Sequence, residues 1–415
     1  MHRVVVIGAG FAGLNAVKGL ATAPVQVTLI DRENHHLFQP LLYQVATGGL
    51  SPADIASPIR HILRKQSNVR TVLDEVSAID VETGTVTGRV NTYPFDTLIV
   101  AAGATHNYFG NEEWEAVAPG LKKLEDATDI RGRFFAAFEE AERTGDDTPL
   151  TFVVVGAGPT GLEVAGTMAE MVHSEEGFTT IDPSTSRILL IDAAPHILSS
   201  YPPVLREKAQ KQLEELGVEV RTGIKVVDIS SDKVSVEDDQ GERSDIDSAI
   251  TVWAAGVKAS PLGVMLGADT DRAGRVLVNK DLTIPEHPNV FVIGDLASLE
   301  QSGEPIPGVA PAAIQMGKHV ARSIRLQLSG GHAKPFRYSD RGSLATIGRS
   351  AAVADIRGLR FSGFPAWLAW LLIHIYFLVG FQNRLLVMIQ WAFNYISRNR
   401  SARLIINHRP PPPGR

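Results

Sequence analysis

One pattern occurs twice in this sequence and constrains the fold more than any other feature. It consists of an apolar strand, a Gly-x-Gly-x-x-Gly loop, a helix, and a second apolar strand that ends in an acid, and it spans residues 4–31 and again residues 152–192. Strand, helix and strand in this order form the βαβ unit of a parallel sheet that carries helices on both faces. The sequence therefore predicts an α/β fold with two Rossmann-like dinucleotide-binding domains.

The first loop has the residues that a pyrophosphate site requires. Gly8 allows the tight turn, Gly10 lets backbone N–H groups approach the phosphates, and Gly13 lets the helix pack closely on the strand. We expect the helix to begin near Leu14 and Asp31 to accept hydrogen bonds from ribose hydroxyls. A simple glycine-rich turn is the alternative, and the flanking strand, helix and acid argue against it. Two further loop residues belong to the predicted site: Phe11 and Ala12.

The second loop has the same flanks, with glycines at Gly156, Gly158 and Gly161. Its acid, Asp192, follows after about 30 residues rather than the usual ~20, and a polar surface insertion at 174–186 accounts for the difference. An acid at this position favours a free ribose 2′-hydroxyl, so NADH is predicted over NADPH. The alternative is an inert Rossmann remnant that serves only packing.

Composition removes several classes of function. The 415 residues include no cysteine, which excludes disulfides, Cys-ligated zinc, iron–sulfur clusters and c-type haem, and we predict no metal site. Electrons must then travel through an organic cofactor. The net charge of −6 argues against nucleic acid as a partner. The N-terminus lacks the apolar segment of a secretory signal, which favours the cytoplasmic side.

The segments outside the two loops complete a recognisable pattern. Apolar strands at 97–103 and 248–256 each end in Ala-Ala-Gly, residues 71–93 are typical of a β-meander, and a strand at 290–293 leads into Gly294-Asp295. With these features the chain resembles the flavoprotein superfamily that has two dinucleotide-binding domains, in which FAD occupies the first loop and NAD(P)H the second. Residues 283–295 look like its second FAD motif.

Within that superfamily, the chain most resembles the type II NADH dehydrogenases, which are single-chain NADH:quinone oxidoreductases. The resemblance rests on residues 36–48, 102–110, 252–257 and 310–315. It implies an FAD-binding domain at 1–112 and 281–335, an NADH-binding domain at 113–280, and a C-terminal membrane-anchoring and quinone-access region at 336–415. The cofactor contacts that it implies, beyond the two loops, are Arg32, Gln44, Ala102, Gly103, Ala255, Gly256, Gly294, Asp295 and Ala312.

Three residues are predicted from this resemblance to serve catalysis. Glu163 matches the family position near the nicotinamide, although an acid in the first helical turn would stabilise the helix dipole in any case. Gln315 could hydrogen-bond a quinone carbonyl or simply pack at the start of its helix. Pro311 replaces the first Gln of the family motif, so that contact is not carried over. His374 could donate a proton in a quinone tunnel or form a polar seam between two helices.

The C-terminal region is apolar, aromatic and basic. Residues 361–381 approach the ~20 residues of a membrane span but include Pro365 and His374, so a buried helix pair, a span and interfacial helices all compete. The resemblance favours interfacial helices broken around 380–384. No acid follows Asp355, which suits an anionic membrane surface. The aromatic residues expected at the headgroup boundary and the basic residues are Trp367, Trp370, Tyr376, Trp391, Tyr395, Arg384, Arg398, Arg400, Arg403, Arg409 and Arg415, and residues 410–413 form an extended proline tail.

These features together predict a homodimeric peripheral enzyme on the cytoplasmic face of the cell membrane. It would transfer hydride from NADH to FAD and two electrons to a membrane quinone, either ubiquinone or menaquinone, without pumping protons. Sulfide:quinone and disulfide reductases need cysteines that are absent. A soluble NADH:ferredoxin or rubredoxin reductase and a non-catalytic NADH-sensing module remain the alternatives.

Overall fold

The computed structural model describes residues 1–175, 177–378, 381–397 and 402–405. The chain forms two compact units. The first comprises Met1–Leu37, Ala56–His106 and Val257–Arg341, and the second comprises Phe38–Ile55, Asn107–Gly256 and Gly342–Arg415. The expected FAD-binding domain included residues 38–55, which lie in the second unit. The expected NADH-binding domain included residues 257–280, which lie in the first unit, and residues 342–415 are part of the second unit. The functions assigned to the domains stay predictions.

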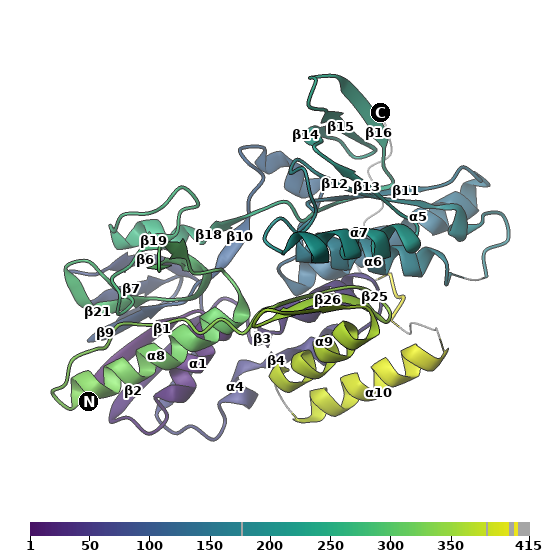
Figure 1. Cartoon of the computed structure of the whole chain (residues 1–415). Coiled ribbons are helices and arrows are strands. Elements are labelled where there is room, and N and C mark those ends of the chain that lie inside the picture. The colour runs from purple at the N-terminus through teal and green to yellow at the C-terminus, as the bar shows by residue number, and fades with distance from the viewer. Residues whose placement is uncertain (176, 379–380, 398–401, 406–415) are drawn as a thin grey trace. The chain divides into compact units, whose positions relative to one another are not determined.

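The first unit is built on a six-stranded sheet in the order β20-β21-β9-β1-β2-β5. Strands β21, β9, β1 and β2 of this sheet are labelled in Figure 1. Alternate residues of β1 face opposite sides, as the period of two in a strand requires. Val4 and Val6 pack against helices α1 and α8, whereas Val5 and Ile7 pack against the meander β6-β7-β8. The elements are β1 (His2–Ile7), α1 (Phe11–Gly19), β2 (Val25–Asp31), β5 (Val69–Leu73), β6 (Val76–Asp80), β7 (Thr85–Gly88), β8 (Thr92–Pro94), β9 (Thr97–Val100), β20 (Thr283–Ile284), β21 (His287–Val292) and α8 (Ala310–Leu328).

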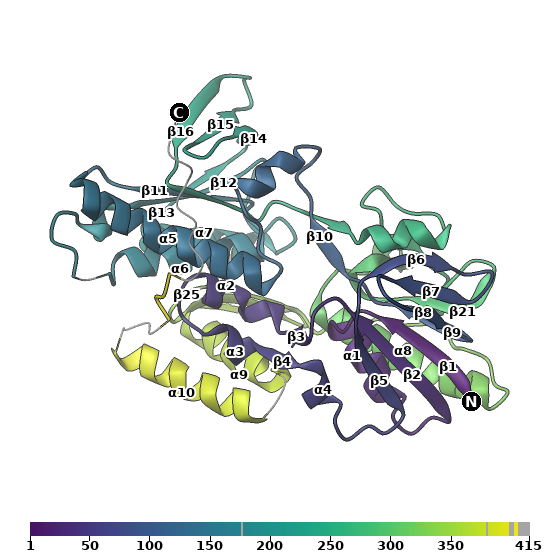
Figure 2. The same cartoon turned by 180° about the vertical axis from the view of Figure 1, so that it is seen from behind.

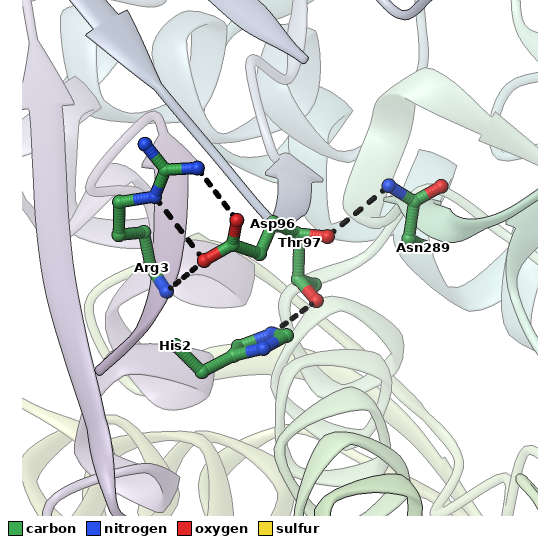
Figure 3. Close-up of polar contacts among 5 residues, drawn as sticks. All are labelled: His2, Arg3, Asp96, Thr97 and Asn289. Carbon is green, nitrogen blue, oxygen red and sulfur yellow. Dashed lines mark hydrogen bonds and ion pairs between the residues drawn. The ribbon is translucent and has the colours of Figure 1, made fainter.

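Polar contacts hold together the ends of β1, β9 and β21 that lie away from the glycine loop (Figure 3). Arg3 forms an ion pair with Asp96, with 2.6 Å between Nη2 and Oδ1. The hydrogen bond from the Arg3 side chain lowers the pKa of Asp96 to about 2. His2 hydrogen-bonds Thr97 at 2.9 Å, and the Asn289 side-chain amide donates to the Asp96 carbonyl at 3.1 Å. These contacts set the strand register that aligns the opposite ends of the strands.

The second unit repeats the arrangement with the parallel sheet β13-β12-β11-β17. Phe152 in β11 lies opposite Ile188 and Ile250, and all three side chains are buried. This repeat confirms the predicted α/β fold. Its elements are α5 (Leu124–Thr144), β11 (Thr151–Val155), α6 (Pro159–Val172), β12 (Arg187–Asp192), α7 (Pro203–Glu215), β13 (Val218–Thr222), β14 (Lys225–Ile229), β15 (Lys233–Glu237), β16 (Arg243–Asp247) and β17 (Ile250–Trp253).

The C-terminal part of the second unit consists of an antiparallel sheet and two helices (Figure 1). The sheet contains β25 (Ser343–Gly348), β26 (Ala351–Ile356) and β27 (Leu359–Ser362), and α9 (Phe364–Phe377) packs on it. Because α10 (Phe381–Ser397) begins at residue 381, residues 381–384 of the expected break range 380–384 are helical. Neither these nor any other helices in the described part of the chain have the length and apolar character needed to cross a membrane.

Short elements link the sheets to the sites described below. They include β3 (His35–Leu37), η1 (Gln39–Leu41), α2 (Leu42–Ala46), α3 (Pro52–Ile55), β4 (Ala56–Pro58), α4 (Ile59–Ile62), β10 (Ala104–His106), β18 (Val257–Ala259) and η5 (Gly294–Leu296).

Candidate active site

The first glycine loop has a shape that side chains would destroy. Gly8 has a φ of +96°, and a Cβ atom at this residue would lie 2.4 Å from the carbonyl oxygen of Ala101. A Cβ atom at Gly13 would lie 1.9 Å from the Gly8 carbonyl oxygen. At Gly10, by contrast, a Cβ atom would meet no atom within 4 Å. The loop is therefore closed on the strand side and open at the helix N-terminus, where a phosphate would bind.

The acid of the first repeat is held by the backbone of that loop. Asp31 Oδ2 accepts a hydrogen bond from Ala9 N at 2.5 Å, and Oδ1 accepts one from Glu33 N at 2.8 Å. Burial raises the pKa of Asp31, and these two hydrogen bonds oppose the rise. Helix α1 begins at Phe11, three residues before the expected Leu14, so its free N–H groups lie directly at the loop.

The second loop repeats this geometry. Gly156 has a φ of +105°, and a Cβ atom at Gly161 would lie 1.8 Å from the Gly156 carbonyl oxygen, whereas one at Gly158 would meet no atom within 4 Å. Asp192 accepts hydrogen bonds from Ala157 N at 2.5 Å and from Ala194 N at 2.7 Å. Each loop thus pairs open space at a helix N-terminus with a carboxylate that retains free lone pairs. Both arrangements fit a dinucleotide.

The second FAD motif lies beside the first loop. Gly294 has a φ of +74°, and a Cβ atom there would lie 3.2 Å from the Ala12 Cβ atom. The adjoining Asp295 and the start of α8 border a cavity of about 10 Å³. Fold and packing therefore bring Ala12, Gly294, Asp295 and Ala312 together in the first unit, as a shared FAD site requires. The other residues lining the cavity include Arg275, Gly308 and Met316.

The remaining predicted cofactor residues lie at strand ends or on the surface. Ala102 and Gly103 follow β9, and Ala255 and Gly256 follow β17, which places both pairs at the carboxyl edges where ligands bind in parallel sheets. Arg32 follows β2 with an exposed side chain. Their contacts with cofactors stay predictions.

Gln315 lies in the second turn of α8 rather than at its start. Its side-chain Nε2 donates to the Ser339 carbonyl at 3.0 Å, and its Oε1 accepts from Ser339 N at 2.9 Å. The amide therefore ties α8 to the segment around residue 339. This contact supports the packing role, and the quinone contact stays a prediction.

Glu163 lies beyond the first turn of α6, so the expected first-turn position was wrong and the helix dipole explains little of its presence. Helix α6 packs so closely on β25 that a Cβ atom at Gly166 would lie 1.7 Å from the Ile347 carbonyl oxygen. Burial raises the pKa of Glu163 to about 8, and a hydrogen bond with the Thr346 backbone opposes this rise. Glu163 is therefore largely protonated and neutral at pH 7, a state suited to holding a proton.

An aromatic pocket of about 540 Å³ lies in the second unit. Gln44 in α2 is fixed at its wall, because its Nε2 donates to the Tyr43 hydroxyl at 2.9 Å and its Oε1 accepts from the Trp391 indole at 2.7 Å. Trp370, expected at a headgroup boundary, is instead buried against Trp391, with 5.5 Å between ring centroids. The pocket is also lined by Trp367, Thr167, Thr346, Glu170, His173 and Arg349.

His374 packs in the interior of the same unit. Its ring stacks on Trp370 at 4.2 Å between centroids and meets the edge of Phe38 at 6.2 Å. Its Nδ1 donates to the Trp370 carbonyl at 2.7 Å, and burial lowers its pKa to about 4. The imidazole is then neutral at pH 7, which disfavours proton donation, and the polar seam between two helices stays a prediction. The proton-donor role stays a prediction.

Sequence reasoning missed several residues around these groups. Thr346 contacts Glu163 from β25, and Tyr201 lies close enough for the Glu163 charge to raise the tyrosine pKa further. Tyr43 was part of a recognised stretch, but nothing in the sequence indicated that it would line a pocket with three tryptophans. None of these residues belongs to a motif whose spacing carries a mechanism. Only tertiary packing brings them to the site.

Comparison with known proteins decides the family. Residues 2–317 match the pyridine nucleotide-disulphide oxidoreductase family, and residues 341–399 match the NDH2 C-terminal domain. Two type II NADH:quinone oxidoreductases of Mycobacterium tuberculosis (strain ATCC 25618 / H37Rv), NdhA and Ndh, are each 47% identical over 96% of this chain and 88% and 89% of their own lengths. This chain belongs to the type II NADH:quinone oxidoreductase family.

Solved structures agree with the fold of a type II NADH:quinone oxidoreductase. NDH2 from Plasmodium falciparum in complex with NADH superimposes with a TM-score of 0.88 at 19% identity, covering 98% of this chain and 100% of that one. The sulfide:quinone oxidoreductase of Aquifex aeolicus gives a TM-score of 0.76 at 20% identity, covering 92% of each chain. At these identities the likeness establishes the fold alone.

Proposed function

We propose that this chain is a non-proton-pumping NADH:quinone oxidoreductase that moves hydride from NADH to FAD and two electrons onward to a membrane quinone. The observation that carries this proposal is the pair of complete glycine loops, each with its acid held by the loop backbone at 2.5 Å. A chain with one nucleotide site would need only one such loop. The named activity of the relatives supports the same reaction.

The residues divide the work between binding and proton handling. When bound, FAD supplies a two-electron carrier between the hydride donor and the quinone. The first loop with Asp31 and Asp295 would hold it, and the second loop with Asp192 would hold NADH. Precise positioning and exclusion of water are what the protein adds to such chemistry.

The aromatic pocket is the place that we assign to the quinone. Its walls of tryptophan and tyrosine suit a flat apolar ring, and the Gln44 amide is the polar group that orients such a ligand. Ubiquinone and menaquinone both contain a flat ring of this kind. A protein acceptor such as ferredoxin or rubredoxin would need a surface rather than a pocket, so this observation favours the quinone over the soluble-reductase alternative.

Glu163 would supply a proton for quinone reduction. The wild-type kcat is expected to fall as pH rises through about 8, because Glu163 holds its proton below that pKa and has lost it above. Glu163→Gln keeps the shape but has no acidic proton, so we expect roughly 100-fold lower kcat at pH 7 and no step near pH 8. The measurement is kcat against pH at saturating NADH and soluble quinone, with the exposed Glu207→Gln as control. An unchanged profile would exclude this role.

Asp192 would select NADH. A carboxylate repels the 2′-phosphate of NADPH and accepts from the free 2′-hydroxyl of NADH. In Asp192→Ala, the ratio of kcat/KM for NADH to that for NADPH is expected to fall about tenfold or more. FAD content serves as the control, since the first loop is untouched. A ratio equal to that of the wild type would sink the assignment.

Peripheral membrane binding on the cytoplasmic face and homodimerisation belong to the same proposal. Helices α9 and α10 expose apolar side chains, among them Leu372 at 58% and Ile389 at 57%.

Of the basic tail, Arg403 forms an ion pair with Glu175 at 3.3 Å and is not free for lipid. The other tail positions, Arg398, Arg400, Arg409, Arg415 and residues 410–413, lie outside the described residues, as do Gly380 and the side chain of Tyr395.

Turnover with different acceptors tests the proposed function. The purified holoprotein is supplied with NADH and with either a short-chain soluble quinone or rubredoxin. Sustained NADH oxidation with the quinone and little with rubredoxin is the expected result. The reverse preference would favour the soluble reductase, and binding of NADH without turnover of either acceptor would favour the sensing module.

A further inference from the structure

A short basic segment of the first unit forms no ion pair with an acid of the described chain. It comprises Arg60, Arg64, Lys65 and Arg70, all with exposed side chains. Between Asp54 and Asp74 the sequence has no acid, although the whole chain has a net charge of −6. This stretch is therefore basic, although the net charge of the whole chain is negative.

Three other arginines of this protein are paired with neighbouring acids. Arg187 and Arg221 both contact Glu219, and Arg275 contacts Asp271. Across residues 1–175, 177–378, 381–397 and 402–405, no ion pair involves any cation of the basic segment. Arg64 instead hydrogen-bonds the ring and carbonyl of His61, and neither of these groups is an acid that could pair with its charge.

The basic segment follows a few residues after helix α3, which packs on α10. Within the second unit, α3 packs beside α10 (Figure 2). Helix α10 exposes Leu385, Leu386 and Ile389. Helix α4, which carries Arg60, begins at Ile59, four residues after α3 ends at Ile55. Arg60 follows Ile55 by five residues, and five extended residues span at most about 18 Å. Covalent connection alone therefore keeps the start of the basic segment close to the α3 end.

We propose that the basic segment binds anionic phospholipid headgroups while the apolar side chains of α9 and α10 enter the bilayer. This inference rests on the proposed peripheral membrane binding and adds the lipid class that this part of the chain selects. Each exposed cation near an anionic surface strengthens binding by roughly fivefold at moderate salt. Uncompensated cations give this gain in full, because no ion pair with a protein acid must first be broken.

The test compares two charge-matched triple variants of the FAD-loaded protein. One carries Arg60→Gln, Arg64→Gln and Lys65→Gln. The control carries Lys208→Gln, Lys225→Gln and Lys233→Gln, which removes three exposed cations from α7, β14 and β15. Co-sedimentation is measured with vesicles of phosphatidylcholine alone and with vesicles containing phosphatidylglycerol. Turnover with a soluble quinone shows that both variants remain active.

The expected result is that the first variant loses roughly tenfold or more of its binding to phosphatidylglycerol vesicles, while its binding to phosphatidylcholine is unchanged. The control variant should bind both as the wild type does. Equal binding by the two variants to anionic vesicles would overturn the inference and leave the proposed function intact. If the wild type bound neither vesicle, peripheral membrane binding itself would be refuted.

Discussion

Replacing Gly158 with valine is expected to leave the protein folded and yellow while flavin reduction by NADH becomes roughly 100-fold slower or worse at a fixed NADH concentration. A Cβ atom at this residue would meet no protein atom within 4 Å, so the fold tolerates it. The backbone already has φ −77° and ψ −179°, which valine adopts readily. The side chain would occupy the space where the NADH pyrophosphate must approach the N–H groups of α6.

The matched variant in the first loop separates the two cofactors. Gly10 also has open space, with φ −65° and ψ −167°. Gly10→Val is therefore expected to fold but to purify without FAD. Flavin content from absorbance and single-turnover reduction by NADH measure both outcomes. If Gly158→Val also lost its flavin, or kept wild-type reduction, the assignment of NADH to the second loop would be wrong.

The second large effect concerns membrane attachment. Replacing Leu372 and Ile389 together with glutamate is expected to lower the membrane-bound fraction by roughly 100-fold. Both side chains are more than half exposed, so their contribution to the fold is small. Burial of either side chain in lipid favours membrane binding by the transfer free energy of an apolar side chain. A glutamate carboxylate at the same position disfavours membrane binding, because it would have to leave water.

Point substitutions are preferable here to removal of the C-terminal helices. Helix α9 contributes Ala366 to a small core with Ala352 and Ala354, and truncation would expose these two alanines to water. A control double variant carries Val90→Glu and Val264→Glu, two exposed apolar positions of the first unit. Vesicle co-sedimentation and NADH turnover are measured for both. Attachment at the wild-type level in the α9 and α10 variant would contradict the interfacial role of these helices.

The parts of this protein that the sequence predicted are those fixed by local rules. The glycine loops, the acids that close each repeat and the parallel strands follow from turn geometry and hydrophobic periodicity, and the structure has all of them in place. The resemblance rested on longer stretches, and the comparisons confirm the family. The expected helix start near Leu14 was wrong, because α1 begins at Phe11.

The parts that could not be predicted depend on packing between distant segments. Trp370 is a suitable headgroup residue by composition, yet it is buried because α9 folds over β26. Glu163 owes its raised pKa to burial beside β25, almost two hundred residues further along the chain. No motif contains both, so only the fold brings them together. The same reasoning explains why His374 has a pKa of about 4 rather than a free histidine's value.

The central claim is tested most directly by anaerobic stopped-flow absorbance of the purified holoprotein, mixed first with NADH and then with a soluble quinone. We expect NADH to bleach the flavin band and the quinone to restore it rapidly, with one quinone consumed per NADH. Bleaching that a quinone fails to reverse would contradict quinone reduction and indicate a different acceptor. Absence of a flavin band would contradict the assignment of FAD to the first loop.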